Sequence, residues 1–266
     1  MTVGLFIPCY VDQFYPKVAI ATLELLESLG CKVGYPLNQT CCGQPMANSG
    51  FARLTKACDA NFVENFKDFD YIVAPSGSCV LHIKEHLHAE KDEKTAEILR
   101  GPSMSEDEFL MSENMPKSQT LNNRIFELTE FLTDILKVKT LSARFPHRVG
   151  YHVSCHGQRG LGLSSASEIV GAPFSKPLQL LDLVEGLELV TLKRNDECCG
   201  FGGTFCVTEE AVSVKMGKDR VADHLEQKVE YIVGGDMSCL MHIEGILKRQ
   251  NSLVKILHIA EILIAK

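Results

Sequence analysis

Two copies of a Cys-Cys-Gly tripeptide, Cys41–Gly43 and Cys198–Gly200, are the residues of this chain most suited to chemistry. Adjacent side chains point to opposite faces of a strand, so a vicinal pair of thiols cannot share one face of regular β-structure. A turn can direct both thiols toward one centre, and the glycine that follows permits such a turn because it lacks a Cβ atom. The vicinal pairs therefore indicate a metal centre or a redox site.

Each tripeptide lies between two single cysteines, so both halves of the chain have the order Cys, Cys-Cys-Gly, Cys. The eight cysteines of this pattern are Cys9, Cys41, Cys42, Cys79, Cys155, Cys198, Cys199 and Cys239. Thiolate sulfur selects zinc, copper(I) and iron–sulfur centres, and four thiolates satisfy either a tetrahedral zinc ion or a [4Fe-4S] cluster. Structural zinc sites usually draw their ligands from Cys-x2-4-Cys pairs, which this sequence lacks. Widely spread ligands that include a vicinal pair favour the larger iron–sulfur cluster.

Composition restricts the class of protein. A hydrophobic fraction of 45% and a charged fraction of 23% are typical of a globular chain. The net charge of -7 argues against binding to nucleic acid, and no apolar run approaches the roughly 20 residues that span a bilayer. The N-terminus does not resemble a secretion signal, and eleven cysteines without one indicate a reducing compartment. We therefore expect a cytoplasmic protein.

Short β-rich segments alternate with helical patterns along the first half. Strands are expected at 2–8, 31–35 and 71–74, and helices at 17–29 and 50–69, from the spacing of apolar residues and the glycines that end them. Alternation of this kind predicts a parallel sheet covered by helices. Ligands of such sheets collect beyond the carboxyl ends of the strands, which is where the cysteines lie in the sequence.

The second half repeats the first. Segment 231–243 shares Tyr, Ile, Val, Ser, Cys, His and Ile in register with segment 71–83, and the ends of the halves also correspond. Helices are expected over 124–137, where the pattern is amphipathic, and over the apolar run 253–266. So many aligned matches indicate an internal duplication.

The predicted fold class is α/β, with two Rossmann-like parallel-sheet halves whose cysteine loops face a shared cleft. The first half is expected to cover residues 1–143 and to contain an inserted charged segment at about 89–122. The second half is expected to cover residues 144–266, with the boundary in a stretch of proline and basic residues.

The motif order and three signatures, Ile7–Tyr10, Gln39–Pro45 and Pro75–Cys79, resemble the CCG-domain (cysteine-rich domain) iron–sulfur proteins. That family includes the cysteine-rich component of heterodisulfide reductase and the iron–sulfur component of glycolate oxidase, and the similarity is greatest to the lactate-utilisation protein A type. The resemblance covers nearly the whole chain.

The resemblance implies an iron–sulfur electron-transfer subunit of a complex that oxidises L-lactate without NAD. It implies one or two [4Fe-4S] clusters per chain, held by the eight cysteines of the pattern, and exposure to oxygen is expected to remove them or replace them with zinc. Proteins of the lactate-utilisation B and C types would be the partners. Peripheral association with a membrane through the complex is compatible with this interpretation.

The sequence departs from the family pattern at one point in each half. The family's final Cys-x-x-Cys is Ser76–Cys79 in the first half and Asp236–Cys239 in the second, so each half retains four cysteines of five. A four-thiolate [4Fe-4S] site is therefore expected in place of the unusual non-cubane cluster of heterodisulfide reductase. Ser76 and Asp236 are interpreted as helix caps.

Polar residues around Cys155 are the candidates for catalysis. His156 and Arg159 could donate protons or bind a substrate carboxylate, although we favour support of the metal centre, as for His152. Three further cysteines have no counterpart in the other half and are expected to serve packing: Cys31, Cys58 and Cys206.

Two other functions fit the cysteines. The vicinal pairs could cycle through disulfides in a thiol redox enzyme, or zinc could hold a scaffold subunit together. Colour and metal content distinguish these alternatives, because an iron–sulfur cluster absorbs visible light and contains acid-labile sulfide.

Overall fold

Short runs of apolar and β-branched residues form parallel strands in the part of the chain that the computed structural model describes, residues 1–87 and 121–266. The strands are β1 (Thr2–Leu5), β2 (Lys32–Gly34), β3 (Tyr71–Ala74), β4 (Ile125–Glu127), β5 (Arg148–His152), β6 (Glu188–Leu189), β7 (Tyr231–Gly234) and β8 (Lys255–His258). They form two sheets with the orders β2-β1-β3-β4 and β6-β5-β7-β8. The predicted α/β duplication is therefore confirmed.

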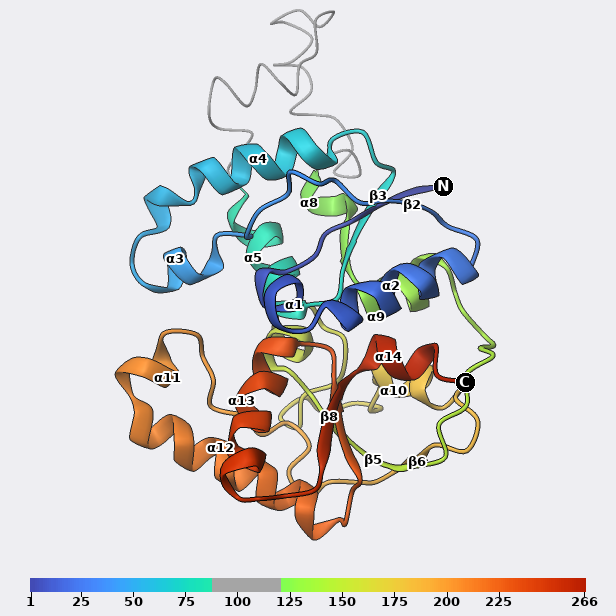
Figure 1. Ribbon diagram of the computed structural model, residues 1–266, viewed down its shortest axis with the longest axis vertical. Helices are drawn as coiled ribbons and strands as arrows, with labels where there is room; N and C mark the ends of the chain where they lie inside the picture. The colour runs from blue at the N-terminus through green and yellow to red at the C-terminus, as the bar shows by residue number, and fades with distance from the viewer. Residues whose placement is uncertain (88–120) are drawn as a thin grey trace, which may run out of the picture.

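Helices connect consecutive strands of each sheet (Figure 1). In the first half they are α1 (Cys9–Phe14), α2 (Pro16–Ser28), α3 (Gln44–Asn48), α4 (Lys56–Phe66), α5 (Gly77–His86), α8 (Leu121–Arg124) and α9 (Leu128–Glu130), with a 3-10 turn η1 (Ala52–Leu54) and a π-helical turn η5 (Phe131–Ile135). In the second half they are α10 (Lys176–Leu181), α11 (Phe205–Thr208), α12 (Glu210–Glu226), α13 (Met237–Arg249) and α14 (Ile259–Leu263), with a π-helical turn η6 (His156–Gly160).

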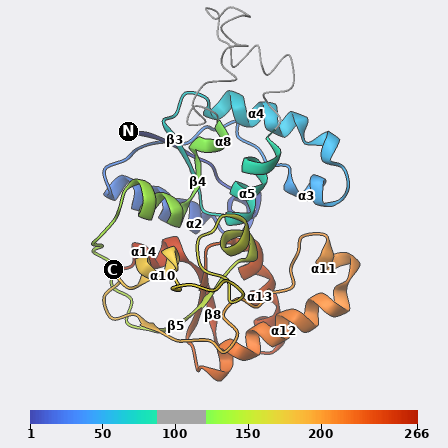
Figure 2. The same ribbon diagram turned by 180° about the vertical axis from the view of Figure 1, so that it is seen from behind.

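The two halves pack against each other through equivalent elements. Helix α2 packs on α14, and its counterpart α10 packs on α9; likewise α5 contacts η6 and α1 contacts α13 (Figures 1 and 2). One hydrophobic core includes buried residues of both sheets, such as Val3 and Val149. The halves therefore share an approximate twofold arrangement and one continuous core.

Two predicted helices were wrong at their first residues. The segment 124–137 contains strand β4 before its helical turns, and 253–266 contains strand β8 before α14. Their apolar spacing fits both a helix and a buried strand, and pairing with β3 and β7 decides in favour of the strand. The insertion expected at about 89–122 lies almost entirely outside the described residues.

The last strand of each sheet ends in a residue that caps the next helix. The carboxylate of Glu127 accepts hydrogen bonds from the backbone N–H of Thr129 (2.6 Å) and Glu130 (3.2 Å), and His258 occupies the equivalent place in the second half. Glu127 is 1% exposed. Burial raises its pKa to about 7, although hydrogen bonds from Thr129 act in the opposite direction.

Within the described residues no helix is long and apolar enough to cross a membrane.

The buried Glu127 predicts a dependence of stability on pH. Because its pKa is raised on folding, the native protein holds a proton that the unfolded chain loses between about pH 4.5 and 7, so rising pH destabilises the fold in that window. Glu127→Gln keeps a side-chain oxygen that accepts hydrogen bonds but cannot ionise. We therefore expect the variant to lose up to about 3 kcal/mol less unfolding free energy than the wild type as pH rises through this window. Denaturant unfolding of reduced, metal-free protein at pH 5 and pH 8 measures it.

The exposed Glu64→Gln on α4 is the matched control and should keep the wild-type dependence on pH. Parallel pH profiles for the wild type and Glu127→Gln would show that the carboxyl group does not hold a proton in the fold.

Candidate metal centres

The cysteines of the first half lie at the carboxyl edge of its sheet. Cys9 begins α1 directly after β1, Cys79 lies in the first turn of α5 after β3, and the Cys41–Cys42 pair lies in the loop after β2. Strands β1 and β3 are the neighbours between which the sheet order reverses. Open α/β sheets bind ligands at this switch point, because loops from neighbouring strands diverge there and leave a crevice.

The second half places its cysteines in the same way. Cys155 follows β5, Cys239 lies in the first turn of α13 after β7, and the Cys198–Cys199 pair lies in the loop after β6. Strands β5 and β7 flank the switch point of this sheet. The duplication thus builds two equivalent sets of four thiols.

The thiols of each set lie in contact with one another. In the first half Cys42 Sγ donates to Cys79 Sγ at 3.3 Å, and hydrogen bonds also link Cys41 to Cys9 and Cys42. In the second half the same chain of contacts runs from Cys155 through Cys198 and Cys199 to Cys239. All eleven cysteines lie in the described residues and are free thiols. The donor set therefore fits a thiolate-ligated metal centre in each half.

Crowding controls the ionisation of these thiols. Hydrogen bonds from Cys42 and Cys9 lower the pKa of Cys41, and hydrogen bonds from Cys155 and Cys199 lower the pKa of Cys198. The thiols that donate these hydrogen bonds have raised pKa values. The hydrogen bonds are the largest cause, followed by burial and nearby thiolates, and the thiols concerned are Cys9, Cys42, Cys155 and Cys199. Four thiolates at contact distance repel one another, so full ionisation needs a metal cation among them.

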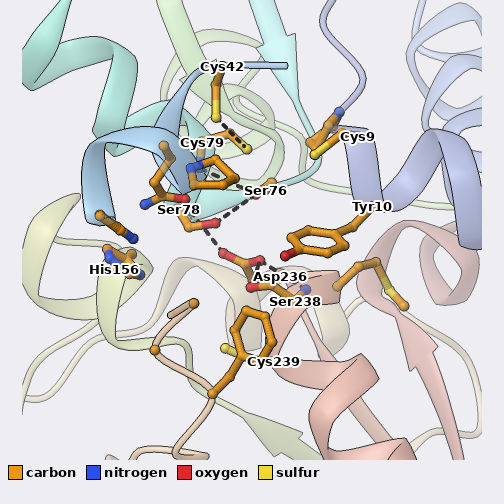
Figure 3. Close-up of a pocket in the computed structure, with 18 of the residues that line it drawn as sticks. Cys9, Tyr10, Cys42, Ser76, Ser78, Cys79, His156, Asp236, Ser238 and Cys239 are labelled. Carbon is orange, nitrogen blue, oxygen red and sulfur yellow. Dashed lines mark hydrogen bonds between the residues drawn. The ribbon is translucent and has the colours of Figure 1, made fainter. Parts of the chain in front are cut away.

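The two sets of cysteines line one cavity of about 240 Å³ between the halves (Figure 3). Seven of the eight pattern cysteines line it, all except Cys41. The ring of Tyr10 from the first half packs edge-on against Phe201 from the second, with centroids 6.1 Å apart, and both residues line the cavity. The cleft predicted between the halves is therefore confirmed.

Ser76 and Asp236 are helix caps, as predicted, and they also join the halves. Ser76 accepts from the backbone N–H of Cys79, and Asp236 from that of Ser238. The second carboxylate oxygen of Asp236 accepts from the backbone N–H of Ser78 at 2.9 Å, across the junction. Both carboxylate oxygens thus accept hydrogen bonds from backbone N–H groups. This favours a structural role for Asp236 over a role as a metal ligand.

The two catalytic candidates occupy different places. His156 lines the cavity (Figure 3). The guanidinium of Arg159 lies at the surface, where it pairs with Glu168 (3.1 Å) and Asp196 (3.7 Å), and it does not line the cavity. A role for either side chain toward a substrate stays a prediction, and the geometry favours His156 over Arg159.

The cysteines outside the pattern take separate positions. Cys31 is buried in the core just before β2, at the opposite edge of the sheet from the thiol sets. Cys58 lies on α4, and Cys206 Sγ donates to the backbone carbonyl of Gly203 at 3.0 Å.

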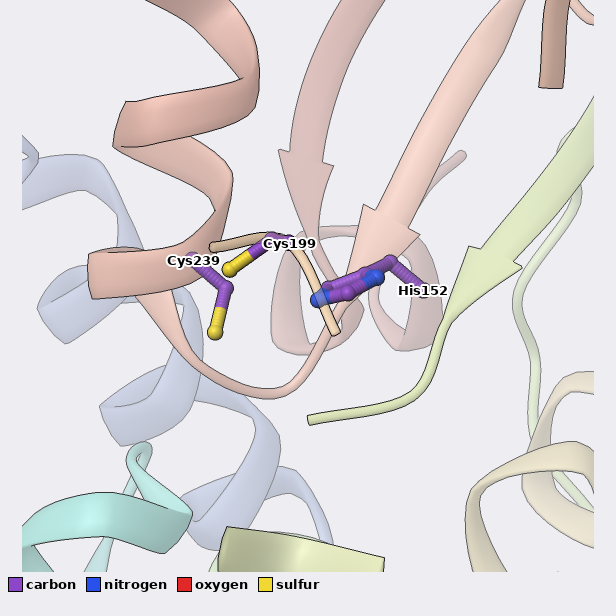
Figure 4. Close-up of side chains that lie close together, drawn as sticks. All are labelled: His152, Cys199 and Cys239. Atoms are coloured by element: carbon purple, nitrogen blue, oxygen red, sulfur yellow. The ribbon is translucent and has the colours of Figure 1, made fainter. Parts of the chain in front are cut away.

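His152 adds an imidazole to the second set of thiols. It is 1% exposed, and one of its ring nitrogens lies within 4.8 Å of the sulfurs of Cys199 and Cys239 (Figure 4). Its Nδ1 accepts a hydrogen bond of 3.1 Å from Nε of Arg220, a fully buried residue on α12. Arg220 was missed from the sequence because it lies 21 residues beyond the nearest cysteine of the pattern before it, Cys199, and only the fold brings it to the site.

The glycine of each tripeptide lets the thiol loop turn. Gly43 and Gly200 have φ values of 91° and 85°, which residues with a Cβ atom seldom adopt. A Cβ atom on Gly200 would lie 2.6 Å from the backbone oxygen of Ser213 and 2.8 Å from Cβ of Met216. The backbone N–H of Gly200 also donates to Cys198 Sγ at 3.3 Å.

Gly200→Ala is expected to destabilise the protein and to prevent metal loading of the second half. The positive φ alone costs about 1–2 kcal/mol, and collision with the backbone of α12 adds about 1–3 kcal/mol. Gly30→Ala is the matched control, because Gly30 has a φ of 83° and no atom within 4 Å of the added Cβ. Denaturant unfolding and metal content compare the two variants; equal effects would contradict the close packing of the thiol loop.

Comparisons with known proteins agree with this architecture. A family model of the cysteine-rich domain CCG matches residues 3–84 and 149–244, one match in each half. A protein called Lactate utilization protein A from Geobacillus kaustophilus is 40% identical over 266 residues, which cover 100% of both chains. A protein of the same name from Bacillus licheniformis is 39% identical over 263 residues, 99% of each chain.

The fold is also similar to the crystal structure of a hypothetical protein from Helicobacter pylori. The TM-score is 0.59 at 12% sequence identity, and the match covers 98% of this chain and 48% of that one. This chain thus spans about half the length of that protein, and the likeness shows the fold alone. On the matched domains and the full-length relatives, the chain belongs to the cysteine-rich CCG-domain family, in the group formed with the proteins called Lactate utilization protein A.

Proposed function

We propose that each half holds one [4Fe-4S] cluster on its four cysteines, and that the chain carries electrons in a complex that oxidises L-lactate. The observation that carries this proposal is the gathering of two complete four-thiol sets at equivalent switch points. A bound cluster would supply one-electron chemistry, and the residues of this chain would hold it and shield it from water.

The ligands in the first half would be Cys9, Cys41, Cys42 and Cys79. The ligands in the second half would be Cys155, Cys198, Cys199 and Cys239. Two centres that line one cavity of about 240 Å³ suit transfer of electrons between them, because both sets of ligands face the same space. The partners would be proteins of the lactate-utilisation B and C types, and the names of the relatives support the link to lactate.

A zinc ion is the second candidate, because His152, Cys199 and Cys239 offer ligand atoms within 4.8 Å of one another. The hydrogen bond from Arg220 weakens this alternative. A guanidinium can only donate, so Nδ1 of His152 is the unprotonated nitrogen and Nε2 carries the proton. Ligation of zinc through Nε2 would require loss of that proton, which a neutral imidazole gives up with difficulty.

The test is the iron and acid-labile sulfide content of anaerobically purified protein, with a visible spectrum of the same sample. We expect about eight of each per chain, the content of two [4Fe-4S] clusters. Cys41→Ser and Cys198→Ser should each remove about half of the iron. Cys31→Ala, at the far edge of the sheet, is the control and should keep all of it.

Zinc without sulfide would favour the scaffold alternative, and a colourless protein without metal would favour thiol chemistry. Loss of iron from Cys31→Ala equal to that from Cys198→Ser would contradict the assignment of ligands.

The link to lactate has a separate test. The isolated chain should not be reduced by L-lactate, because its sequence contains no Gly-x-Gly-x-x-Gly motif of the kind that binds a dinucleotide cofactor. Addition of partner proteins of the B and C types should let L-lactate bleach the visible absorbance under anaerobic conditions. Bleaching by L-lactate with the chain alone would place the oxidation of substrate on this chain.

A further inference from the structure

The two halves differ in the residues packed beneath the thiol sets. Strand register pairs Val3 with Tyr71 and Val149 with Tyr231, so residues of β1 and β5 correspond at a constant offset, and Phe6 is the counterpart of His152. Both are almost fully buried. A histidine therefore takes the place of a phenylalanine next to the second centre.

The helices that pack on these strands, α4 and α12, also differ by a change from aromatic apolar residues to polar ones. In the first half Phe6 packs edge-on against Phe62 (5.3 Å) and Phe66 (5.7 Å) of α4. In the second half His152 contacts Arg220 of α12, and His224 follows one turn later.

The glycines of the strands confirm this correspondence. A Cβ atom on Gly4 would collide with Phe66, and one on Gly150 would collide with His224. An apolar aromatic cluster in the first half is thus a buried polar cluster in the second.

Arg220 fixes the orientation of the imidazole. Its Nε donates to His152, while its terminal nitrogens donate to the backbone carbonyls of Arg194 (2.5 Å) and Tyr151 (3.4 Å). Asp223 lies 3.5 Å from the guanidinium and compensates its charge. A carboxylate thus offsets the charge of Arg220, and the polar group placed next to the sulfurs is the imidazole of His152.

The tautomer follows from these contacts. Nδ1 of His152 accepts from Arg220, so the proton of the neutral ring is on Nε2. Nε2 is buried and has no hydrogen-bond partner among the described residues. A buried N–H without a partner is costly. A ring nitrogen of His152 lies within 4.8 Å of the sulfurs of Cys199 and Cys239. Because Nδ1 is engaged by Arg220, Nε2–H is the donor that remains for these sulfurs. Figure 4 shows the ring pointing toward these two side chains.

We propose that Nε2–H of His152, held in place by Arg220, donates a hydrogen bond to sulfur of the second-half centre and makes it the electron acceptor of the pair. This inference rests on the proposed function. Hydrogen bonds to the sulfurs stabilise the more negative, reduced state of a cluster and so raise its reduction potential. The first centre has Phe6 at this position, which cannot donate.

Other hydrogen-bond donors near the thiol sets either occur in both halves, so that their effects cancel, or add to the difference in reduction potential between the centres. His82 and His242 follow the last cysteine of each half by three residues, so they are present on both sides. Backbone N–H groups donate to Cys198 and Cys199 in the second half and to Cys41 in the first. In the transfer itself one electron would leave the first centre, which would be oxidised, and would reduce the second, with no bond made or broken.

The test is a redox titration of the anaerobic full-length protein, with the reduced clusters followed by electron paramagnetic resonance. Cys41→Ser and Cys198→Ser assign the two signals to their halves. We expect the second centre to have the higher potential. His152→Phe, which copies the first half, should lower it by a tenfold change in the one-electron equilibrium or more, about 59 mV, and leave the first centre unchanged.

Two further variants separate the hydrogen bond from a structural effect. His152→Gln can accept from Arg220 and still donate, so its potential should stay closer to wild type than that of His152→Phe. His224→Phe makes the same exchange one helical turn away, at the position equivalent to Phe66 in the first half, and should change neither potential.

Equal potentials in the wild type, an unchanged potential in His152→Phe, or an equal shift in His224→Phe would each overturn the inference while leaving two clusters in place. Failure of the anaerobic protein to load iron at either half would instead refute the proposed function, and this inference with it. The tautomer gives an independent readout: nitrogen NMR of the metal-free protein should show the proton of His152 on Nε2, and a proton on Nδ1 would contradict the mechanism.

Discussion

The structure depends on one electrostatic constraint: four thiols per half lie at contact distance and cannot all ionise without a cation among them. Parallel strands bring the loops that carry them to one edge of the sheet, and the reversal of strand order opens a crevice there. The glycine of each tripeptide lets the vicinal pair turn into that crevice. A metal centre satisfies the thiols that the fold has gathered.

The duplication then turns two such edges toward each other. The backbone N–H of Ser78 donates to the carboxylate of Asp236 across the junction, and buried residues of both halves form one hydrophobic core. The cavity between the centres is lined by both sets of cysteines and by Tyr10 and Phe201. Duplication alone would give two equal centres; the exchange of Phe6 for His152 makes them unequal.

Much of this organisation could be predicted from the sequence, because the cysteine pattern repeats and each cysteine follows a β-rich segment. The shared cleft could be predicted for the same reason. The caps at Ser76 and Asp236 could be predicted because each residue lies between a strand and the helix that follows it. Strands β4 and β8 could not, since their apolar spacing also suits a helix and only pairing with a neighbouring strand distinguishes the two. Arg220 was missed because its contact with His152 joins residues that lie 68 positions apart. The available signal was the comparison of the two repeats, in which His152 takes the place of Phe6 and therefore needs a polar partner.

The central claim is that the eight cysteines hold two metal centres, one at each switch point. The most direct measurement is an anomalous difference map at the iron absorption edge, from crystals grown without oxygen. Two peaks are expected, each surrounded by the four sulfurs of one half. A single peak bridging the halves, or iron bound away from these cysteines, would contradict it.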